Sequence, residues 1–250
     1  MIASDQNELT PTPQPPAPKP AAVKQQDALR EFYCSPLADG RNRYEVWEQG
    51  EACGDSVTPS TYCPEYRSHM VLKMMWLSKP RGRVFSIGCG NAFIETDLQA
   101  RGMRVQAIDC NQEAVDLAVG KGVDAFAADY YKLPSGHLAY FDVVYADGLL
   151  GHVYRPDTGL DGFFSTLRKL AVPIGSWIVL SNDAPPQPEK PVTPHPSLSG
   201  FWLFSREYVR EAVERGGYTV VECYSFPYER PVSGLRSRTI CFAHLTAPAT

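Results

Sequence analysis

The chain has 250 residues, of which 44% are hydrophobic and 21% are charged, and its formal net charge at pH 7 is −4. This length and apolar content suit one core-forming domain with additions and exclude disorder throughout, and the acidic balance argues against a nucleic-acid partner. No segment approaches the ~20 apolar residues that cross a membrane, and the N-terminus lacks the apolar segment of a signal peptide. We therefore expect a cytoplasmic protein, either a small-molecule enzyme or a protein-binding module.

The chain begins with a proline-rich tail. Residues 11–20 read PTPQPPAPKP, with six prolines and no large apolar side chain, so nothing in this segment can offset the entropy of ordering. We expect residues 1–23 to be a disordered extension. A polyproline ligand for a partner protein is the alternative.

Residues 24–80 are rich in aromatic side chains, and we expect them to form an N-terminal helical cap, or lid, on the main domain. Two parts are predicted to be helical, around 27–33 and 63–77. In the second, apolar side chains recur at helical spacing from Tyr66 to Leu77. The segment GEACGDSVTPSTYCP between them is typical of a loop.

From residue 81 onward, short apolar runs alternate with helical segments. Strands are predicted at 84–87, 105–108, 125–128, 142–146 and 177–180, and helices at 93–100, 112–119 and 162–170. This alternation is typical of a parallel sheet that is covered by helices on both faces.

The last part of the chain adds a second proline-rich stretch and a strand pair. Residues 184–200 contain six prolines, and because a disordered linker inside a domain is uncommon, we expect residues 184–204 to form an ordered loop over the site. A helix at 206–214 precedes strands at 219–226 and 239–245, which have no helix between them and therefore favour an antiparallel hairpin. The predicted fold of residues 81–250 is α/β, with a Rossmann-like, mainly parallel sheet of seven strands.

The first predicted strand runs into Gly88-Cys89-Gly90 and then into a helix. In open α/β sheets such a turn places backbone N–H groups at the crevice where ligands bind, although a plain strand-to-helix turn explains the two glycines equally well. A dinucleotide fingerprint needs a third glycine at position 93, where the sequence has Phe93. A nicotinamide-dependent oxidoreductase is therefore a less favoured alternative.

Acidic side chains follow the next three strands. Asp109 ends the second strand, where a carboxylate can accept hydrogen bonds from the ribose hydroxyls of an adenosine ligand; an ordinary acidic turn residue is the alternative. Asp129 and Tyr130 end the third strand, where a carboxylate can accept from an adenine amino group and a ring can cover the base. Asp147 ends the fourth strand and is expected to point at the same crevice.

These four strand ends, in this order and at this spacing, resemble the class I S-adenosylmethionine-dependent methyltransferases over residues 83–180, and the 219–245 pair resembles the terminal hairpin of that superfamily. The resemblance implies S-adenosyl-L-methionine as cofactor. It implies that the glycines line the methionine part, the acid after the second strand holds the ribose, and the acid and ring after the third frame the adenine. The implied cofactor site consists of Gly88, Gly90, Asp109, Cys110, Asp129, Tyr130 and Asp147.

The segment FYCSPLADGRNRYEVWEQG before the first strand extends the resemblance to small-molecule, natural-product members. In those a tyrosine closes over the cofactor, and Tyr33 and Tyr44 are the candidates here. Two positions depart from the superfamily pattern: Ser86 stands where an acidic residue is frequent, and Ala92 replaces a frequent glycine.

His152 follows the fourth strand, near the start of a helix that faces the crevice, and many superfamily members carry a histidine nearby. Much of the acceleration of methyl transfer can come from placing the acceptor against the methyl group, and a base is needed only if the acceptor must lose a proton. Because imidazole titrates near neutral pH, His152 is the candidate catalytic residue. A role in packing or in orienting the loop is the alternative.

No metal is expected, because the seven cysteines are widely spaced and include no Cys-x-x-Cys pair. The sequence predicts an S-adenosylmethionine-dependent methyltransferase that acts on an oxygen, nitrogen or carbon atom of a small, aromatic or heteroaromatic secondary metabolite, as a monomer or homodimer. A catalytically inactive scaffold of the same fold, which binds a partner, is the alternative from a different class.

Overall fold

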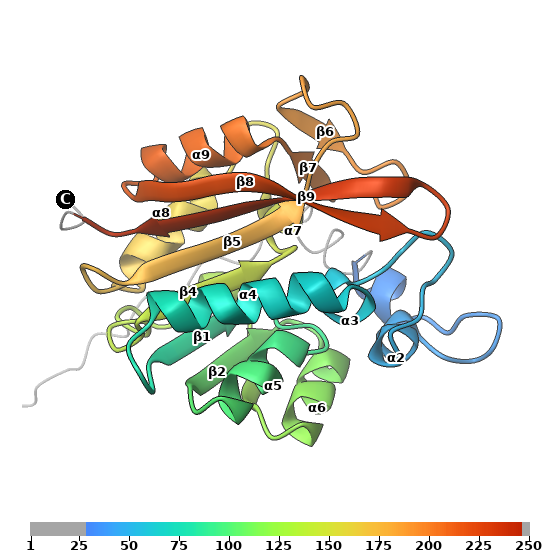
Figure 1. Cartoon of the computed structure of the whole chain (residues 1–250), viewed down its shortest axis with the longest axis horizontal. Coiled ribbons are helices and arrows are strands. Elements are labelled where there is room, and N and C mark those ends of the chain that lie inside the picture. The colour runs from blue at the N-terminus through green and yellow to red at the C-terminus, as the bar shows by residue number, and fades with distance from the viewer. Residues whose placement is uncertain (1–28, 247–250) are drawn as a thin grey trace, which may run out of the picture.

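One sheet of seven strands organises residues 29–246, the part of the chain that this computed structural model describes. The strand order is β3-β2-β1-β4-β5-β9-β8 (Figure 1). Strands β1 to β5 run parallel, and β9 is antiparallel to both of its neighbours. The strands are β1 (Arg83–Ile87), β2 (Arg104–Asp109), β3 (Asp124–Ala127), β4 (Val143–Asp147), β5 (Trp177–Asp183), β8 (Thr219–Arg230) and β9 (Gly234–His244). The predicted α/β fold, with its mainly parallel sheet and terminal antiparallel hairpin, is confirmed.

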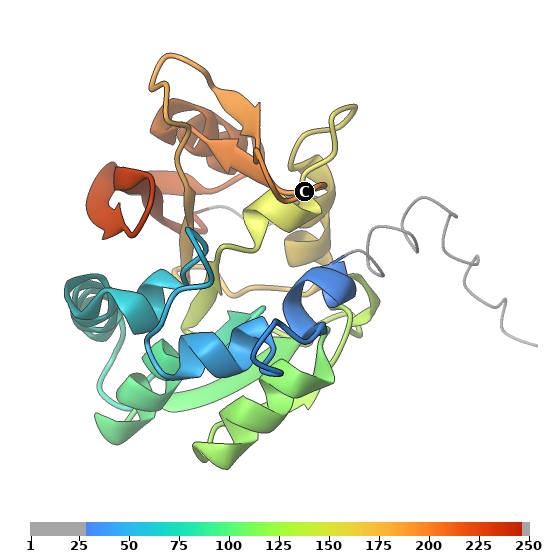
Figure 2. The ribbon, with the colours of Figure 1, turned by 90° about the vertical axis from the view of Figure 1, so that its right-hand side faces the viewer.

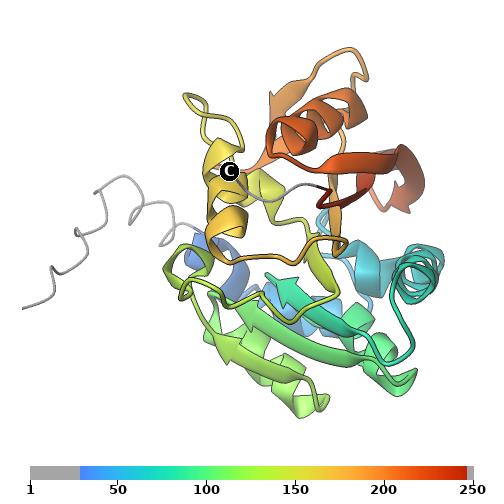
Figure 3. The ribbon, with the colours of Figure 1, turned by 90° about the vertical axis from the view of Figure 1, so that its left-hand side faces the viewer.

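Alternate residues of the inner strands contribute to two hydrophobic cores, one on each face of the sheet. In β1, Val84 packs in the core that contains Met70, whereas Phe85 packs in the core that contains Phe163. Since both faces are buried, the strands read as continuous apolar runs in the sequence. Figure 3 shows the two helical layers that bury them. The first layer consists of α4 (Pro64–Leu77), α5 (Phe93–Ala100) and α6 (Gln112–Gly120), and the second of α8 (Asp161–Lys169) and α9 (Arg206–Arg215).

Residues 29–62 cross the carboxyl edge of the parallel strands, which faces the viewer in Figure 2. Residues 29–34 are helical, and two short helices follow, α2 (Arg43–Glu48) and α3 (Pro59–Tyr62). Neither short helix was expected from the sequence, although Asn42 and Glu45 form a capping box at the start of α2, a signal that the sequence carries. Helix α4 instead packs on the sheet, so only the first part of segment 24–80 has the position of a cap. The predicted tail, residues 1–23, lies outside the described residues.

The strand hairpin β8–β9 is longer than its apolar runs indicated. Its first strand was expected to end at Phe226, but it continues through Pro227 to Arg230. Because β8 is an edge strand, proline can be accommodated there. The proline-rich loop contains a small hairpin of its own, formed by β6 (Val192–Pro194) and β7 (Trp202–Phe204). None of the helices within residues 29–246 has the length and apolar character that a bilayer crossing requires.

Candidate active site

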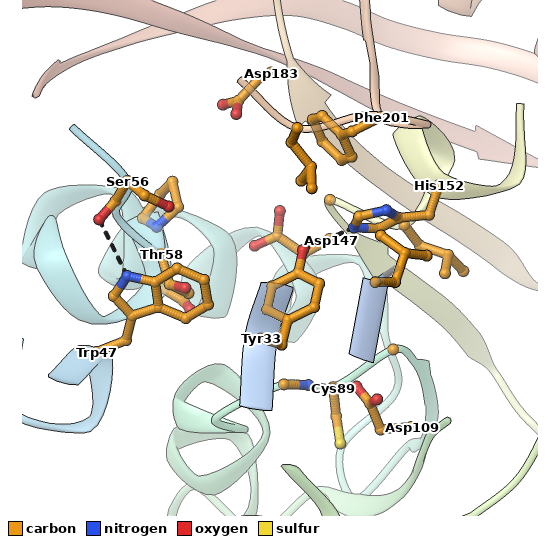
Figure 4. A pocket seen from close by; sticks show the side chains of 18 of the residues that line it. Tyr33, Trp47, Ser56, Thr58, Cys89, Asp109, Asp147, His152, Asp183 and Phe201 are labelled. Atoms are coloured by element: carbon orange, nitrogen blue, oxygen red, sulfur yellow. Dashed lines mark hydrogen bonds between the residues drawn. The ribbon is translucent and has the colours of Figure 1, made fainter. Parts of the chain in front are cut away.

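A cavity of about 810 Å³ opens at the carboxyl edge of the parallel strands. Residues that follow β1 to β4 form one side of it, and residues 29–60, the proline-rich loop and the hairpin β8–β9 form the others. Figure 4 shows Tyr33, Asp109, Asp147 and His152 in this region. All the residues that the sequence assigned to the site line this cavity: Tyr33, Tyr44, Gly88, Gly90, Asp109, Cys110, Asp129, Tyr130, Asp147 and His152. Their individual roles stay predictions.

The turn after β1, which we call the glycine turn, consists of Gly88, Cys89 and Gly90, and its backbone holds it against β2. The N–H groups of Gly88 and Cys89 both donate to the carbonyl of Ile108, at 2.8 and 3.1 Å. Gly88 and Gly90 have positive φ angles of 74° and 51°, a region that favours glycine. A side chain at Gly90 would meet nothing within 4 Å. The backbone at Gly90 is therefore open to a ligand, whereas Gly88 lies against Leu149.

Asp109, the last residue of β2, is fixed by two backbone donors. Its Oδ2 accepts from the N–H of Gly90 at 3.0 Å, and its Oδ1 accepts from the N–H of Asn111 at 2.9 Å. Burial raises the pKa of Asp109, although these backbone N–H groups act in the opposite direction. Each carboxylate oxygen still has lone-pair capacity for the hydroxyl of a ligand.

The residues after β3 form one end of the cavity. Asp129 caps the short helix η1 (Tyr130–Lys132) by accepting from the N–H of Tyr131 at 3.0 Å. Tyr130 is buried, and its hydroxyl donates to the carbonyl of Phe163 at 2.9 Å, so its ring is held in the core while one part reaches the cavity. Tyr131 also lines the cavity and is more exposed. It is a ring that the sequence-based assignment missed, although it is the next residue in the chain.

Three aromatic rings from the N-terminal segment line the cavity and pack on one another. Tyr33 stacks on Tyr44 with ring centroids 5.4 Å apart, and both contact Trp47 edge to face. The hydroxyl of Tyr44 accepts from Nδ2 of Asn111 at 2.9 Å. The two tyrosines predicted to close over the cofactor are thus adjacent to each other and to the end of β2.

His152 lies on the short helix α7 (Leu150–Val153), and its Nε2 is 2.8 Å from the hydroxyl of Tyr33. Phe201 packs on the imidazole at 4.6 Å between centroids, and a Cβ on the neighbouring Gly151 would come within 2.4 Å of that ring. Burial, with a smaller effect of His195, lowers the pKa of His152 to about 3. The expectation of an imidazole that titrates near neutral pH is therefore corrected, because the enclosed ring stays neutral.

A group of charged side chains, which we call the charged wall, also lines the cavity. It consists of Asp147, Asp183, Arg230 and Arg238. Arg238 pairs with Asp147 and, at 2.9 Å, with Asp183, and Arg230 pairs with Asp183 at 2.6 Å. Burial alone would raise the pKa of Asp183, but the two guanidinium groups hold it below its usual value. The sequence prediction included Asp147 as a cofactor residue. It also included Asp183, just past the fifth strand, as a candidate for binding polar groups of the acceptor, with a role in the turn as the alternative, but neither arginine. A clue to the rest was Arg238, a charged residue beside an apolar strand run, since buried charges are almost always paired.

A second feature that was not predicted lies beside the glycine turn. Ser86 in β1 donates from its hydroxyl to Oε1 of Glu95 in α5, and both residues are buried. Glu95 lines the cavity. Burial raises its pKa to about 7, against the effect of the Ser86 hydrogen bond, and the charges of Asp147 and Asp109 raise it further.

The chain matches known proteins at the level of family and fold. Residues 85–174 match the model of a methyltransferase domain. A tabtoxin biosynthesis enzyme of Pseudomonas amygdali pv. tabaci is 50% identical over 200 residues, which cover 80% of this chain and 79% of that protein. An S-adenosyl-L-methionine-dependent Diels-Alderase of Talaromyces variabilis is 28% identical over 158 residues, which cover 57% and 53% of the two chains.

A solved structure with a similar fold is the 1,6-didemethyltoxoflavin-N1-methyltransferase of Burkholderia thailandensis, which contains 1,6-didemethyltoxoflavin and S-adenosylhomocysteine. The two chains have a TM-score of 0.61 and 20% sequence identity, and the match covers 95% of this chain and 94% of the other. The shared fold thus includes the N-terminal segment over the cavity as well as the sheet.

Proposed function

The chain belongs to the class I S-adenosylmethionine-dependent methyltransferases, and on that premise we propose that it methylates an oxygen, nitrogen or carbon atom of a small secondary metabolite. One observation carries the proposal. The glycine turn and the acids after β2 and β3 open into the same cavity as the Tyr33–His152 pair and the charged wall. A cofactor and a small acceptor can therefore meet in one cavity.

The order of the strands supports an orientation for the cofactor. Asp129 follows β3, Asp109 ends β2, and the glycine turn follows β1, which is the neighbour of β2 on its other side. In the proposed arrangement Asp129 accepts from the adenine amino group, Asp109 accepts from the ribose hydroxyls, and the turn lines the methionine part. When bound, S-adenosylmethionine supplies an electrophilic methyl group on a sulfonium.

The other side of the cavity supports a small acceptor that has both a flat part and polar groups. Tyr33, Trp47 and Phe201 offer ring faces, which suit an aromatic or heteroaromatic portion and also attract a sulfonium. The charged wall offers hydrogen bonds to polar substituents. Rings and charges together hold the reacting atom of the acceptor toward the glycine turn, so that positioning provides much of the catalysis.

We further propose that His152 removes a proton from the acceptor during transfer. The imidazole is neutral, and its Nε2 contacts the Tyr33 hydroxyl. Its low pKa makes it a weak base, so the proton moves only as the arriving methyl group makes the acceptor proton strongly acidic. Tyr33 then takes that proton while it passes its own to His152. Burial raises the pKa of Tyr33 far above its usual value, which keeps this hydroxyl protonated between transfers. If the acceptor needs no deprotonation, the same pair orients it.

Isotope transfer from labelled S-adenosylmethionine into metabolite fractions tests the function. We expect the wild-type protein to label one small metabolite, and the Asp109→Ala variant to label it much more slowly at limiting cofactor. A protein that binds the cofactor but labels no fraction, and leaves none chemically altered, would be the inactive scaffold instead.

A further inference from the structure

The pairing of Ser86 with Glu95 places a carboxylate beside the glycine turn. This carboxylate comes from helix α5 and not from strand β1. Ser86 lies in β1, two residues before Gly88, and it carries no charge. Glu95 lies in the first turn of α5, directly after the glycine turn. The hydroxyl of Ser86 donates a hydrogen bond to the Glu95 carboxylate. Helix α5 thus provides the cavity with an acidic side chain, Glu95, whereas β1 has the uncharged Ser86 at this place.

Glu95 differs from Asp109 and Asp147 in the groups that stabilise its negative charge. Asp147 is paired with Arg238, and Asp109 accepts from two backbone N–H groups. Within residues 29–246, Glu95 has no lysine, arginine or histidine at ion-pair distance. It is only 3% exposed. A cation that binds in the cavity therefore strongly stabilises the ionised form of this buried carboxylate, which has no ion-pair partner among the described residues.

The groups that face Glu95 are acidic or neutral. They are Cys89 in the glycine turn, Asp109 at the end of β2, and Tyr145 and Asp147 in β4. On its own helix, Asp97 is paired with Arg67 of α4 at 2.8 Å. The local field therefore favours a positive ligand group, and it keeps Glu95 partly protonated until one is bound.

We propose that Glu95 binds the ammonium group of the methionine part of S-adenosylmethionine, with Ser86 as its positioning residue. This inference rests on the proposed function, because the glycine turn between these two residues is the expected site of the methionine part. The carboxylate of α5 then takes over the charge that β1 does not supply. Cofactor binding is coupled to the loss of the Glu95 proton, so affinity falls as the pH drops below about 7.

The test compares two ligands that differ in the methionine part. S-adenosylhomocysteine has the amino group, whereas 5′-methylthioadenosine has the same adenine, ribose and thioether without it. In calorimetric titrations, Glu95→Gln should weaken S-adenosylhomocysteine about 10- to 100-fold and leave 5′-methylthioadenosine unchanged. Asp97→Asn removes a carboxylate of the same helix that does not line the cavity, and it should change neither affinity.

Proton release gives a readout that is independent of turnover. At pH 7, titrations in buffers of different ionisation enthalpy should show that the wild type releases more protons on binding than Glu95→Gln does, by up to one proton, since burial raises the pKa of unliganded Glu95 to about 7. Placing a carboxylate on β1 in place of the one on α5 should restore affinity for S-adenosylhomocysteine. Ser86→Asp combined with Glu95→Thr should bind S-adenosylhomocysteine more tightly than Glu95→Thr alone.

The outcomes separate this inference from the function on which it rests. If the wild type binds neither ligand, the proposed function fails. If the wild type binds both and Glu95→Gln weakens neither, or weakens both equally, Glu95 is not the ammonium ligand. The Glu95→Gln variant keeps the shape of the side chain and removes a buried charge, and a melting temperature no lower than that of the wild type shows that it folds.

Discussion

The two sides of the cavity are built in different ways. On the cofactor side, the glycine turn and the acids Asp109 and Asp129 lie where strands end, and backbone N–H groups hold the two carboxylates, as in the contact of Asp109 with Gly90. On the acceptor side, groups from distant parts of the chain meet, as in the Tyr33–His152 contact and the pairing of Arg238 with Asp147. The first side can be predicted from local sequence, whereas the second exists only once the chain has folded. The two sides should therefore respond differently to mutation.

The largest effect is expected on the acceptor side, at His152. If it acts as the base, His152→Ala should lower the single-turnover rate of methyl transfer by about 10²–10⁴-fold, the usual range for one general base. His152→Gln can still hydrogen-bond to Tyr33 but cannot act as a base. His69→Gln, which changes an imidazole on α4 that contacts Tyr224, is the matched control. Near-wild-type transfer by His152→Gln would show that the imidazole only orients its neighbours.

The charged wall should be the most sensitive part of the site for stability. Arg238 is 3% exposed and pairs with two carboxylates. Arg238→Met therefore leaves the largely buried Asp147 without its cation, and it leaves Asp183 ion-paired with Arg230 alone among the described residues. Breaking a buried pair in this way costs about 3–5 kcal/mol of unfolding free energy, measurable by denaturant titration. Arg236→Met, in the same strand, removes a cation that forms no ion pair within the described residues, and it should change stability by less than about 0.5 kcal/mol. Equal losses in the two variants would mean that the wall is not an energetically coupled unit.

A smaller effect is expected from the contact that encloses His152. A Cβ at Gly151 would come within 2.4 Å of the Phe201 ring, so Gly151→Ala must displace that ring at a cost of about 1–3 kcal/mol. Thermal melting measures the cost, and acceptor KM should rise while the affinity for S-adenosylhomocysteine stays the same. Gly162→Ala, at an open position, is the control. A loss of S-adenosylhomocysteine affinity in Gly151→Ala would show that the two sides are not separable.

The smallest effect concerns pH. Because burial lowers the pKa of His152 to about 3, the basic form of the imidazole is fully present from pH 5 to 8. With saturating cofactor and acceptor, the single-turnover rate should therefore show no step near pH 6.5, the usual pKa of histidine. A tenfold fall between pH 6.5 and 5.5 that disappears in His152→Gln would mean that the ring is solvated in the working enzyme.

Most of the fold could be predicted from the sequence, because the parallel strands and their helices follow from local patterns. Apolar runs marked the parallel strands, and the glycine turn and strand-end acids marked the cofactor side. The sequence did not reveal α2, whose capping box occupies only a few residues, or the full length of β8, where Pro227 interrupts the apolar pattern. On the acceptor side, pairs such as Arg238 with Asp147 join residues far apart in the chain, and no spacing rule connects them.

Titration of S-adenosylhomocysteine into Asp109→Ala and His152→Gln, side by side with the wild type, tests the central claim most directly. Asp109→Ala should weaken binding about 10- to 100-fold, because it removes a charged acceptor worth roughly 1.5–3 kcal/mol from the ribose site. His152→Gln should bind as tightly as the wild type, since His152 belongs to the acceptor side. An unchanged affinity in a folded Asp109→Ala variant, or an equal loss in both variants, would contradict the division of the cavity into a cofactor side and an acceptor side.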